Sequence, residues 1–212
     1  MLVSFLCPSR GRPESFLRSM ESISNRAQDS SCFEVLVWLD NDDETAREYP
    51  RLPYVKYFTG ARVGYARLNE VVNILARTAC GRWLFLWNDD VVVRTDNWDV
   101  VLSGIEPTIV GNPMHNHGSS GLCVFPIVPR AWVDQIGHFA LDGANDTWWQ
   151  KIGEINGTLR PVPITLFHDR SDLTGNHDDQ TRRENNYDPA TFWAEDTQAL
   201  IRVDAEELKS CG

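Results

Sequence analysis

Strand-like and helix-like segments alternate through the first 90 residues of this chain of 212 residues. Apolar, β-branched and aromatic runs, which favour strands, cover residues 2–6, 33–39, 54–59 and 83–87. Between these runs, apolar side chains recur at helical spacing over residues 12–25 and 65–79, and residues 43–48 predict a short helix. Alternation of this kind predicts a parallel sheet covered by helices on both faces. The sequence therefore predicts an α/β fold.

The second half of the chain is less regular. Thr95 or Asp96 is able to cap a helix, which predicts a helix from that point to residue 105. Residues rich in Gly, Asn, His and Ser predict a loop over 111–121, and we expect the very polar residues 170–186 to wrap the surface. The other predicted elements are strands at 122–128 and 160–167 and helical segments at 129–136, 144–152 and 188–209.

Composition argues against several kinds of protein. The net charge of −10 and the pI of about 4.9 disfavour broad electrostatic binding to nucleic acid. No segment approaches the ~18 consecutive apolar residues of a membrane span, and the N-terminus lacks the basic start of a signal peptide. The cysteines are odd in number, scattered and without a C-x-x-C pair, which favours free thiols and a cytoplasmic location. They are Cys7, Cys32, Cys80, Cys123 and Cys211.

Polar residues follow three of the predicted strands, at residues 8–12, at residues 40–43 and at Asn88, Asp89 and Asp90. The carboxyl ends of parallel strands meet at one edge of a sheet, where ligands usually bind, so we expect a shared site there. Two adjacent carboxylates are costly to bury unless a cation or a proton compensates them. Asp89 and Asp90 therefore favour a divalent metal at this edge. The alternative for any one of the three segments is a solvated turn.

Several common motifs are absent from the sequence. It contains no G-x-x-x-x-G-K-[ST] segment, and no G-x-G-x-x-G follows the first strand. Residues 118–121 do not form a G-x-S-x-G nucleophile elbow. These absences argue against a P-loop nucleotide site, a Rossmann dinucleotide site and an α/β-hydrolase.

The order of the remaining motifs resembles that of GT-A fold glycosyltransferases, in particular those similar to family 2, which use nucleotide-diphosphate sugars. The resemblance is best over residues 2–95 and extends to about residue 169. It rests on Pro8-Ser9-Arg10 after the first strand, Asp40 after the second, Ala66-Arg67-Leu68-Asn69 on a helix, Asn88-Asp89-Asp90 after the fourth strand, a later Asp on a helix and a His after a strand.

The resemblance implies a Rossmann-like three-layer α/β/α sandwich with a mostly parallel central sheet. It implies a GT-A domain over residues 1–169, in which residues 1–95 form the nucleotide-binding half and residues 96–169 the acceptor half. Residues 170–212 would then be a polar C-terminal extension with a terminal helix.

The resemblance also assigns roles to individual residues. Asp40 would bind the base of the donor, and Asp90 would be the main ligand of Mn²⁺ or Mg²⁺, with His168 as a second ligand. Asn88 departs from the D-x-D motif of the family, and a neutral amide binds a metal more weakly than a carboxylate does. The residues assigned to the nucleotide donor are Pro8, Ser9, Arg10, Arg12, Asp40, Arg67, Asn69, Asn88 and Asp89.

An inverting transferase needs a base that takes the proton of the acceptor hydroxyl. In similar enzymes this base is an Asp at the start of a helix, which implies Asp146 or Asp142 here. Asp146 matches better because it begins the predicted helix and tryptophans follow it. The alternative role for Asp146 is a plain helix cap.

Two histidines of the predicted loop, His115 and His117, also need an interpretation. Alternating histidines are able to bind a metal. A polar loop over a substrate cleft accounts for them equally well.

The predicted function is the metal-assisted transfer of a hexose or pentose from a nucleotide-diphosphate donor, commonly a UDP-sugar in this family, to a hydroxyl acceptor of unknown class. A nucleic acid acceptor is compatible with this function but is not indicated. One alternative is a sugar nucleotidyltransferase, although the Pro8-Ser9-Arg10 segment is a poor match to the Gly-rich loop of those enzymes. Another is a catalytically silent module that binds nucleotide or glycan, which Asn88 leaves open.

Overall fold

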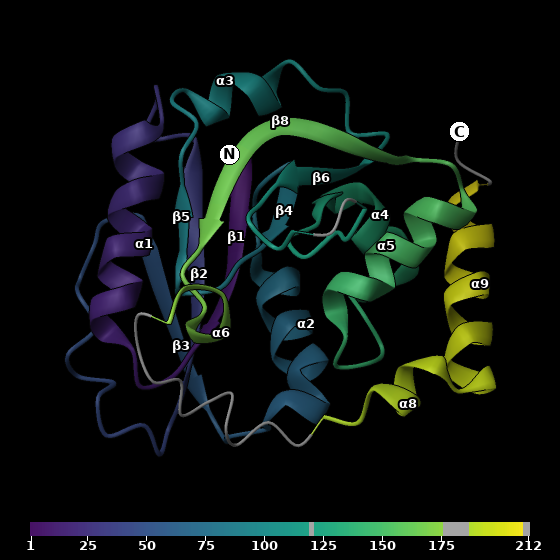
Figure 1. Cartoon of the computed structure of the whole chain (residues 1–212), viewed down its shortest axis with the longest axis horizontal. Helices are drawn as coiled ribbons and strands as arrows, with labels where there is room; N and C mark the ends of the chain where they lie inside the picture. The colour runs from purple at the N-terminus through teal and green to yellow at the C-terminus, as the bar shows by residue number, and fades with distance from the viewer. Residues whose placement is uncertain (119–120, 176–186, 210–212) are drawn as a thin grey trace.

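The computed structural model describes residues 1–118, 121–175 and 187–209, and in this part of the chain eight strands form one curled sheet (Figure 1). Their order across the sheet is β3-β2-β1-β4-β7-β6-β8-β5. The strands are β1 (Val3–Ser9), β2 (Phe33–Asp40), β3 (Val55–Gly60), β4 (Trp83–Leu86), β5 (Val91–Val93), β6 (Val110–Met114), β7 (Ile127–Pro129) and β8 (Leu159–His168). The helices are α1 (Pro13–Arg26), α2 (Leu68–Thr78), α3 (Trp98–Ser103), α4 (Arg130–Ile136), α5 (Asn145–Ile155), α6 (Ser171–Thr174), α8 (Pro189–Trp193) and α9 (Glu195–Lys209), and the 3₁₀ turn η1 (Tyr65–Arg67) leads into α2.

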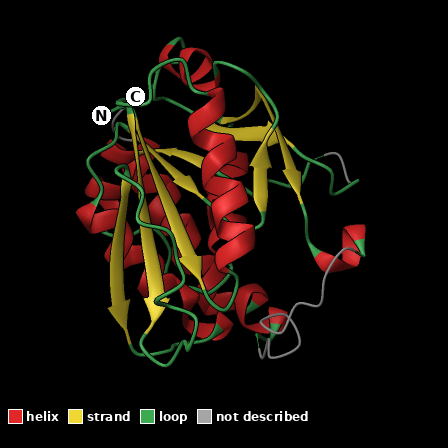
Figure 2. Cartoon of the chain, turned by 90° about the vertical axis from the view of Figure 1, so that its left-hand side faces the viewer, coloured by secondary structure: helices red, strands yellow, loops and turns green. Residues whose placement is uncertain are grey.

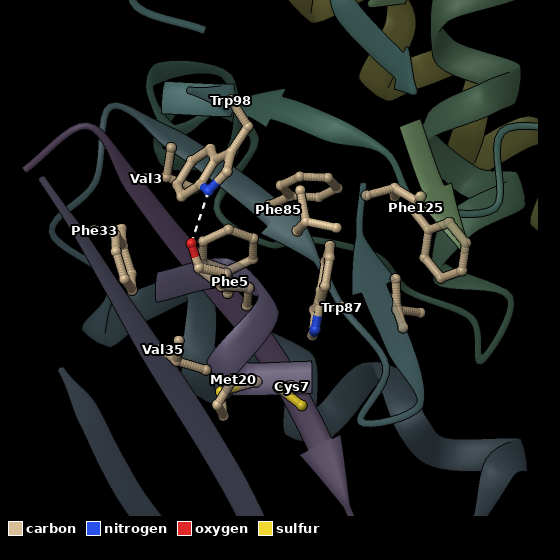
Figure 3. Close-up of a cluster of buried hydrophobic side chains, with 14 of the residues drawn as sticks. Val3, Phe5, Cys7, Met20, Phe33, Val35, Phe85, Trp87, Trp98 and Phe125 are labelled. Carbon is tan, nitrogen blue, oxygen red and sulfur yellow. Dashed lines mark hydrogen bonds between the residues drawn. The ribbon is translucent and has the colours of Figure 1, made fainter. Parts of the chain in front are cut away.

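The alternating faces of the first strands build a core on each side of the sheet. Phe5 of β1 packs with Phe85, Trp87 and Trp98 on the face that α1 and α3 cover, as Figure 3 shows. The Trp98 indole donates a hydrogen bond of 2.9 Å to the carbonyl of Ile23 in α1. Burial of strands on both faces explains why they appear in the sequence as nearly continuous apolar runs.

Leu6 and Leu36 point to the opposite face, where they pack in one cluster with apolar residues of α2, α4, α5 and α9. The chain is therefore a helix–sheet–helix sandwich, and the predicted α/β fold is confirmed. Figure 2 shows the long strands running side by side in one direction with helices on either side of them.

The expectation of a mostly parallel sheet is wrong, because the sheet is mixed. Strands β3, β2, β1 and β4 are parallel, as the alternation of strands and helices predicts. Strand β7 runs antiparallel to β4 and to β6, and β5 runs antiparallel to the end of β8. Strands β5 and β7 have only three residues each, and such short apolar runs carry no periodicity that indicates their direction.

The predicted short helix at residues 43–48 is a series of turns instead. The Asp43 carboxylate accepts hydrogen bonds from the amide and the hydroxyl of Thr45, at 3.0 and 2.8 Å. It also accepts a bond of 2.9 Å from the amide of Gly11. An Asp side chain that binds nearby backbone amides favours turns over a continued helix.

Helix α3 begins at Trp98 and not at the predicted Thr95 or Asp96. The hydroxyl of Thr95 accepts a bond of 2.8 Å from the amide of Thr165, and Asp96 pairs with Arg26. Both candidate caps are therefore engaged by neighbouring elements. Asn97 precedes the helix in a left-handed conformation, with φ of 54°.

The predicted loop at 111–121 begins later than expected, and the predicted strand at 122–128 is shorter than expected. Residues 110–114 form β6, and only Ile127 to Pro129 pair as β7. A side chain on Gly111 would place its Cβ 2.9 Å from Val162 of β8, so the glycine permits close approach of the strands rather than a turn.

The C-terminal helices pack on the rest of the sandwich, and Figure 1 shows α9 (yellow) beside α5. Phe192 of α8 and Ile201 and Leu208 of α9 are buried in the same cluster as the apolar side chains of α2 and α5. The predicted domain boundary after residue 169 stays a prediction. Most of the segment expected to wrap the surface, residues 176–186, lies outside the described residues.

None of the described helices is both long and apolar enough to span a membrane. Cys7, Cys32, Cys80 and Cys123 are free thiols, as expected, and Cys211 lies outside the described residues.

Candidate active site

A cavity of about 500 Å³ opens at the carboxyl ends of β1, β2 and β4. The start of α5 and the residues before α2 form its other walls. It therefore lies at the edge of the sheet where the sequence places the three polar segments. The candidate site residues that line it are Pro8, Ser9, Arg10, Arg12, Asp40, Asn88, Asp146 and His168.

Five other candidate residues do not line the cavity, and two of them, Asp89 and Asp90, lie next to residues that do. Arg67 is exposed and forms an ion pair with Glu70, with contacts of 2.5 and 2.7 Å. Asn69 lies on α2 outside the lining. The Asp142 carboxylate accepts hydrogen bonds from the amide of Ala144 at 2.9 Å and the hydroxyl of Tyr187 at 2.7 Å. The structure thus gives Asp142 local backbone and C-terminal partners.

Asp89 and Asp90 do not line the cavity themselves, but they contact Ser9, Arg12 and His168, which do. They lie in a turn that the amide of Val91 closes on the carbonyl of Asn88 at 3.2 Å. Their side chains are 0% and 2% exposed. This burial excludes a solvated turn and means that each carboxylate needs a compensating partner.

The guanidinium of Arg12 bridges the two carboxylates. Its Nη2 lies 2.7 Å from Asp89 Oδ1, and its Nη1 lies 3.1 Å from Asp90 Oδ2. The Ser9 hydroxyl donates to Asp89 Oδ2 and is 2.7 Å from the hydroxyl of Tyr49. The last residue of β1 therefore supplies a hydrogen bond to Asp89, and Arg12 after it supplies a charge to both carboxylates. We refer to Asp89, Asp90 and Arg12 as the acidic cluster.

His168 supports the acidic cluster from the end of β8. Its Nε2 is 3.0 Å from Asp90 Oδ1, and both side chains are 2% exposed. Burial by itself would raise the pKa of Asp90, but the hydrogen bond and charge of His168, together with the charge of Arg12, outweigh burial and lower that pKa. Asp90 is therefore ionised at neutral pH.

The loop before β7 holds His168 in place. The side-chain amide of Asn116 donates to the carbonyl of His168 at 3.0 Å and accepts from its amide at 2.8 Å. His117 Nε2 lies 2.7 Å from His168 Nδ1. Sequence analysis left His117 between two interpretations, and only its position in the fold connects it to His168.

A second group of charged residues lies at the end of β2. Arg10 Nη1 is 3.2 Å from Asp40 Oδ2 and 2.5 Å from Asp42 Oδ1. Burial raises the pKa of Asp40, and the charge of Arg10 partly offsets this. Asp40 is thus an acceptor in a partly desolvated wall.

The Trp38 side chain, which the sequence analysis did not select, forms an apolar wall beside Asp40. A Cβ on Gly60 would lie 2.3 Å from its ring, so the glycine allows the indole to lie flat on β3. Alternation along β2 places Trp38 and Asp40 on one face of the sheet, and this spacing is the signal that could have found Trp38.

Asp146 lies in the first turn of α5 and lines the cavity. Its carboxylate accepts a hydrogen bond of 2.8 Å from the amide of Thr147. Desolvation by burial raises the pKa of Asp146, and the hydrogen bonds from Thr147 reduce that rise. The two tryptophans after it, Trp148 and Trp149, are fully buried and belong to the core.

The donor atoms of Asp90 and His168 fit a Mn²⁺ or Mg²⁺ ion, because they combine a hard carboxylate oxygen with one imidazole nitrogen in a buried wall. Within residues 1–118, 121–175 and 187–209, no group of three or more His, Cys, Asp or Glu side chains is arranged to hold a metal. This applies equally to His115 and His117. Among His, Cys, Asp and Glu, the described part of the chain thus offers an ion at most two side-chain ligands at one place.

No protein-family model and no curated protein matches the sequence. Solved structures of S. aureus TarS do match the fold. TarS 1–349 in complex with UDP-GlcNAc has a TM-score of 0.69 at 11% sequence identity over 96% of this chain and 66% of that chain. For TarS 1–349 the TM-score is 0.67 at 12% identity, with 96% and 65% covered.

A further TarS structure has a TM-score of 0.64 at 12% identity and covers 81% of this chain. This chain spans only 37% of that TarS chain. At such low identity the likeness concerns the arrangement of the elements. The chain therefore shares the GT-A fold of TarS.

Proposed function

We propose that the chain is a glycosyltransferase that moves a sugar from a nucleotide-diphosphate donor to a hydroxyl acceptor. The observation that carries the proposal is the cavity itself. On a GT-A fold, it joins the buried acidic cluster on one side to the partly desolvated Asp146 on the other. TarS structures contain UDP and UDP-GlcNAc, which supports a uridine nucleotide as the donor.

The nucleotide would lie between β1 and β2. Asp40 accepts a hydrogen bond from the base, and Trp38 offers an apolar surface for it. Arg10 and Arg12 supply positive charge where the diphosphate carries its negative charge. In this placement the base meets a hydrogen-bond acceptor and an apolar surface, and the diphosphate meets positive charge.

Asp90 and His168 are the residues that would hold a Mn²⁺ or Mg²⁺ ion, and the donor and water would complete its coordination. A bound ion stabilises the charge that develops on the departing nucleoside diphosphate. Arg12, which lines the cavity, neutralises the carboxylates of Asp89 and Asp90. Asn88 lines the cavity and contributes a neutral amide beside the donor.

Asp146 would take the proton of the acceptor hydroxyl as this hydroxyl attacks the sugar from the side opposite the diphosphate, which inverts the anomeric carbon. Efficient general bases have a pKa near the working pH. Burial moves the pKa of Asp146 upward and so in that direction. The acceptor hydroxyl must come within hydrogen-bond distance of the carboxylate.

A nucleotide-binding module without activity is the second candidate function. The observation in its favour is that each carboxylate oxygen of Asp89 and Asp90 already has a partner in Arg12, Ser9 or His168. In such a module the acidic cluster would stabilise the cavity wall and would not bind an ion.

Calorimetry with UDP, with and without Mn²⁺, separates the two functions. The transferase is expected to bind UDP more tightly with Mn²⁺, and Asp90→Ala is expected to remove this dependence on the metal. Release of free sugar from a panel of nucleotide sugars then identifies the donor. Failure of every nucleoside diphosphate to bind would reject both functions. Binding that does not depend on the metal and is not followed by turnover would reject the transferase and support the nucleotide-binding module.

A further inference from the structure

Tyr49 is a buried residue in a polar connection, and neither the resemblance nor the proposed function uses it. Residues 41–48, between β2 and Tyr49, are exposed or half-buried, whereas Tyr49 is 4% exposed. Its ring packs against Phe16 of α1 and Tyr57 of β3, with centroid distances of 5.2 and 6.4 Å. This packing brings the hydroxyl of Tyr49 to the end of β1.

The hydroxyl of Tyr49 has two polar partners there. It accepts a hydrogen bond of 3.2 Å from the backbone amide of Arg12 and lies 2.7 Å from Oγ of Ser9. Ser9 donates its only hydroxyl proton to Oδ2 of Asp89, so Oγ of Ser9 must accept the proton of Tyr49. One hydroxyl therefore donates to Ser9 and accepts from Arg12.

These two partners are the residues that hold the buried carboxylates. Ser9 donates to Asp89, and the guanidinium of Arg12 bridges Asp89 and Asp90. Ser9 and Arg12 line the large cavity, whereas Tyr49 does not. Tyr49 therefore reaches the cavity through its two partners.

The turn between these two partners has little else to fix its backbone. Residues 10–12 belong to no helix or strand, and Gly11 is left-handed, with φ of 69°. The amide of Gly11 donates a bond of 2.9 Å to Asp43, but this contact is exposed. Water replaces an exposed partner at little cost, whereas a buried group that loses its partner stays unpaired. The bonds of Tyr49 are therefore a firmer attachment of the turn than that of Asp43.

We propose that Tyr49 is a positioning residue of the donor site, whose hydroxyl holds Ser9 and Arg12 where they support the buried carboxylates and meet the diphosphate. The proposal rests on the proposed function, since it takes Arg12 to lie beside the diphosphate. A displacement of about 1 Å in a positioned group is enough to cost about 100-fold in rate. Loss of the hydroxyl is expected to permit a displacement of this kind, because Ser9 and Arg12 lose one partner each.

Tyr57 serves as the matched control for Tyr49. Its hydroxyl donates a hydrogen bond of 2.6 Å to the carbonyl of Pro50, the residue after Tyr49. Its ring packs against the same Phe16, with centroids 6.2 Å apart. Tyr57→Phe therefore removes a bond from the same segment and leaves both bonds of Tyr49 in place.

Tyr49→Phe removes one oxygen and keeps the packed ring. The readout is the single-turnover release of sugar from UDP-GlcNAc, or from the nucleotide sugar that the wild type hydrolyses fastest. The rate is expressed per folded chain, with the folded fraction taken from denaturant unfolding, so that a loss of stability alone does not change it. Tyr49→Phe is expected to lower this rate about 10- to 100-fold. Tyr57→Phe is expected to stay within about 2-fold of the wild type, because it leaves Ser9 and Arg12 untouched.

A double-mutant cycle with Ser9→Ala tests whether Tyr49 acts through Ser9. In the Ser9→Ala chain the bond between the two hydroxyls is already absent. The effect of Tyr49→Phe on the rate is therefore expected to be at least about 3-fold smaller there than in the wild type. Tyr57→Phe is expected to have the same effect in both chains. UDP affinity, measured by calorimetry on the same four chains, gives a second cycle that does not depend on turnover.

Equal rates per folded chain for Tyr49→Phe and Tyr57→Phe would reject the role of Tyr49 and leave the proposed function standing. Fully additive effects of Tyr49→Phe and Ser9→Ala would reject it as well, since they would mean that the hydroxyl does not act through Ser9. A wild-type chain that neither binds UDP nor releases sugar from any nucleotide sugar would instead reject the proposed function.

Discussion

Two sites with buried carboxylates lie at opposite ends of the central strands. Glu34 is near the amino end of β2, and Asp89 and Asp90 follow the carboxyl end of β4. All three are almost completely buried. The same unfavourable burial of charge therefore has two different solutions in one sheet.

Glu34 is satisfied by the framework of the fold. Its Oε1 accepts hydrogen bonds of 2.7 Å from the hydroxyl of Ser4 and from the amide of Cys80, and Lys56 lies 2.7 Å from its Oε2. These hydrogen bonds, with that of Lys56 the strongest, outweigh desolvation and lower the pKa of Glu34. Glu34 does not line the cavity, so its role is structural.

The acidic cluster differs in the origin of its partners. Arg12 and His168 both line the cavity, and both are side chains able to change partner when a ligand arrives. A framework amide such as that of Cys80 has no such freedom. A buried carboxylate thus points to function when its compensating groups line a cavity, and to stability when they lie away from it, as those of Glu34 do.

Asp146→Asn tests the cavity end of the sheet with the largest expected effect. Loss of a general base is expected to lower the rate of sugar transfer about 10²- to 10⁴-fold. The affinity for UDP is expected to remain that of the wild type, because Asp146 lies on the acceptor side. Single-turnover transfer and UDP calorimetry measure the two quantities. Wild-type transfer by Asp146→Asn would remove Asp146 as the base.

Arg12→Gln tests whether the acidic cluster needs a cation from the chain. Removal of one partner of a buried ion pair typically costs about 3–5 kcal/mol, so we expect a loss of unfolding free energy of this size in metal-free protein. Excess Mn²⁺ is expected to recover part of that loss, since a bound ion replaces the missing charge. Denaturant unfolding with and without Mn²⁺ measures both effects.

Arg18→Gln is the matched control for Arg12→Gln, because Arg18 pairs at 2.6 Å with Asp169, beside His168, and does not touch the acidic pair. Its loss of stability is expected to be smaller and independent of Mn²⁺. The comparison between the two ends of the sheet would fail if Mn²⁺ stabilised Arg12→Gln no more than Arg18→Gln.

Glu34→Gln tests the structural end of the sheet. The neutral amide is still able to accept from Ser4 and Cys80, but it presents a donor to Lys56, so a loss of about 1–3 kcal/mol in unfolding free energy is expected. Binding of UDP to the folded variant is expected to be unchanged. A variant with wild-type stability and weakened UDP binding would contradict the assignment of roles to the two ends.

Much of the cavity end could be predicted from the sequence because parallel strands bring their carboxyl ends together. Asp40, Asn88 and Asp146 are far apart in the chain and line one cavity. Their chemical roles stay predictions, since position alone does not establish a reaction.

Other features depend on contacts that no local pattern contains. The bridge from Arg12 to the acidic pair spans 78 residues of sequence, and the contact of His117 with His168 spans 51. The antiparallel direction of β7 in the sheet depends on its pairing with β4, and a run of three residues does not encode that direction. Periodicity predicts which face a residue occupies, whereas its partner across the fold follows from tertiary packing.

The smallest expected effect that distinguishes the Glu34 site from the Asp90 site is the dependence of stability on pH. The pKa of Glu34 and that of Asp90 are both lowered in the folded chain, from ordinary values of 4.5 and 3.8. The unfolded chain binds more protons below these values, so stability is fully present above about pH 4.5 and falls as the pH drops through the lowered values. Denaturant unfolding at a series of pH values measures this slope.

In Glu34→Gln the loss of stability on acidification is expected to be smaller than in the wild type, because one of the carboxylates whose pKa is lowered by folding is absent. Mn²⁺ is expected to preserve stability of this variant to lower pH, since only the cavity end binds the ion. An equal effect of pH on Glu34→Gln and the wild type would mean that Glu34 gains nothing from its partners. The distinction between the structural role of Glu34 and the ligand-binding role of Asp90 would then have no support from energetics and would depend only on their positions.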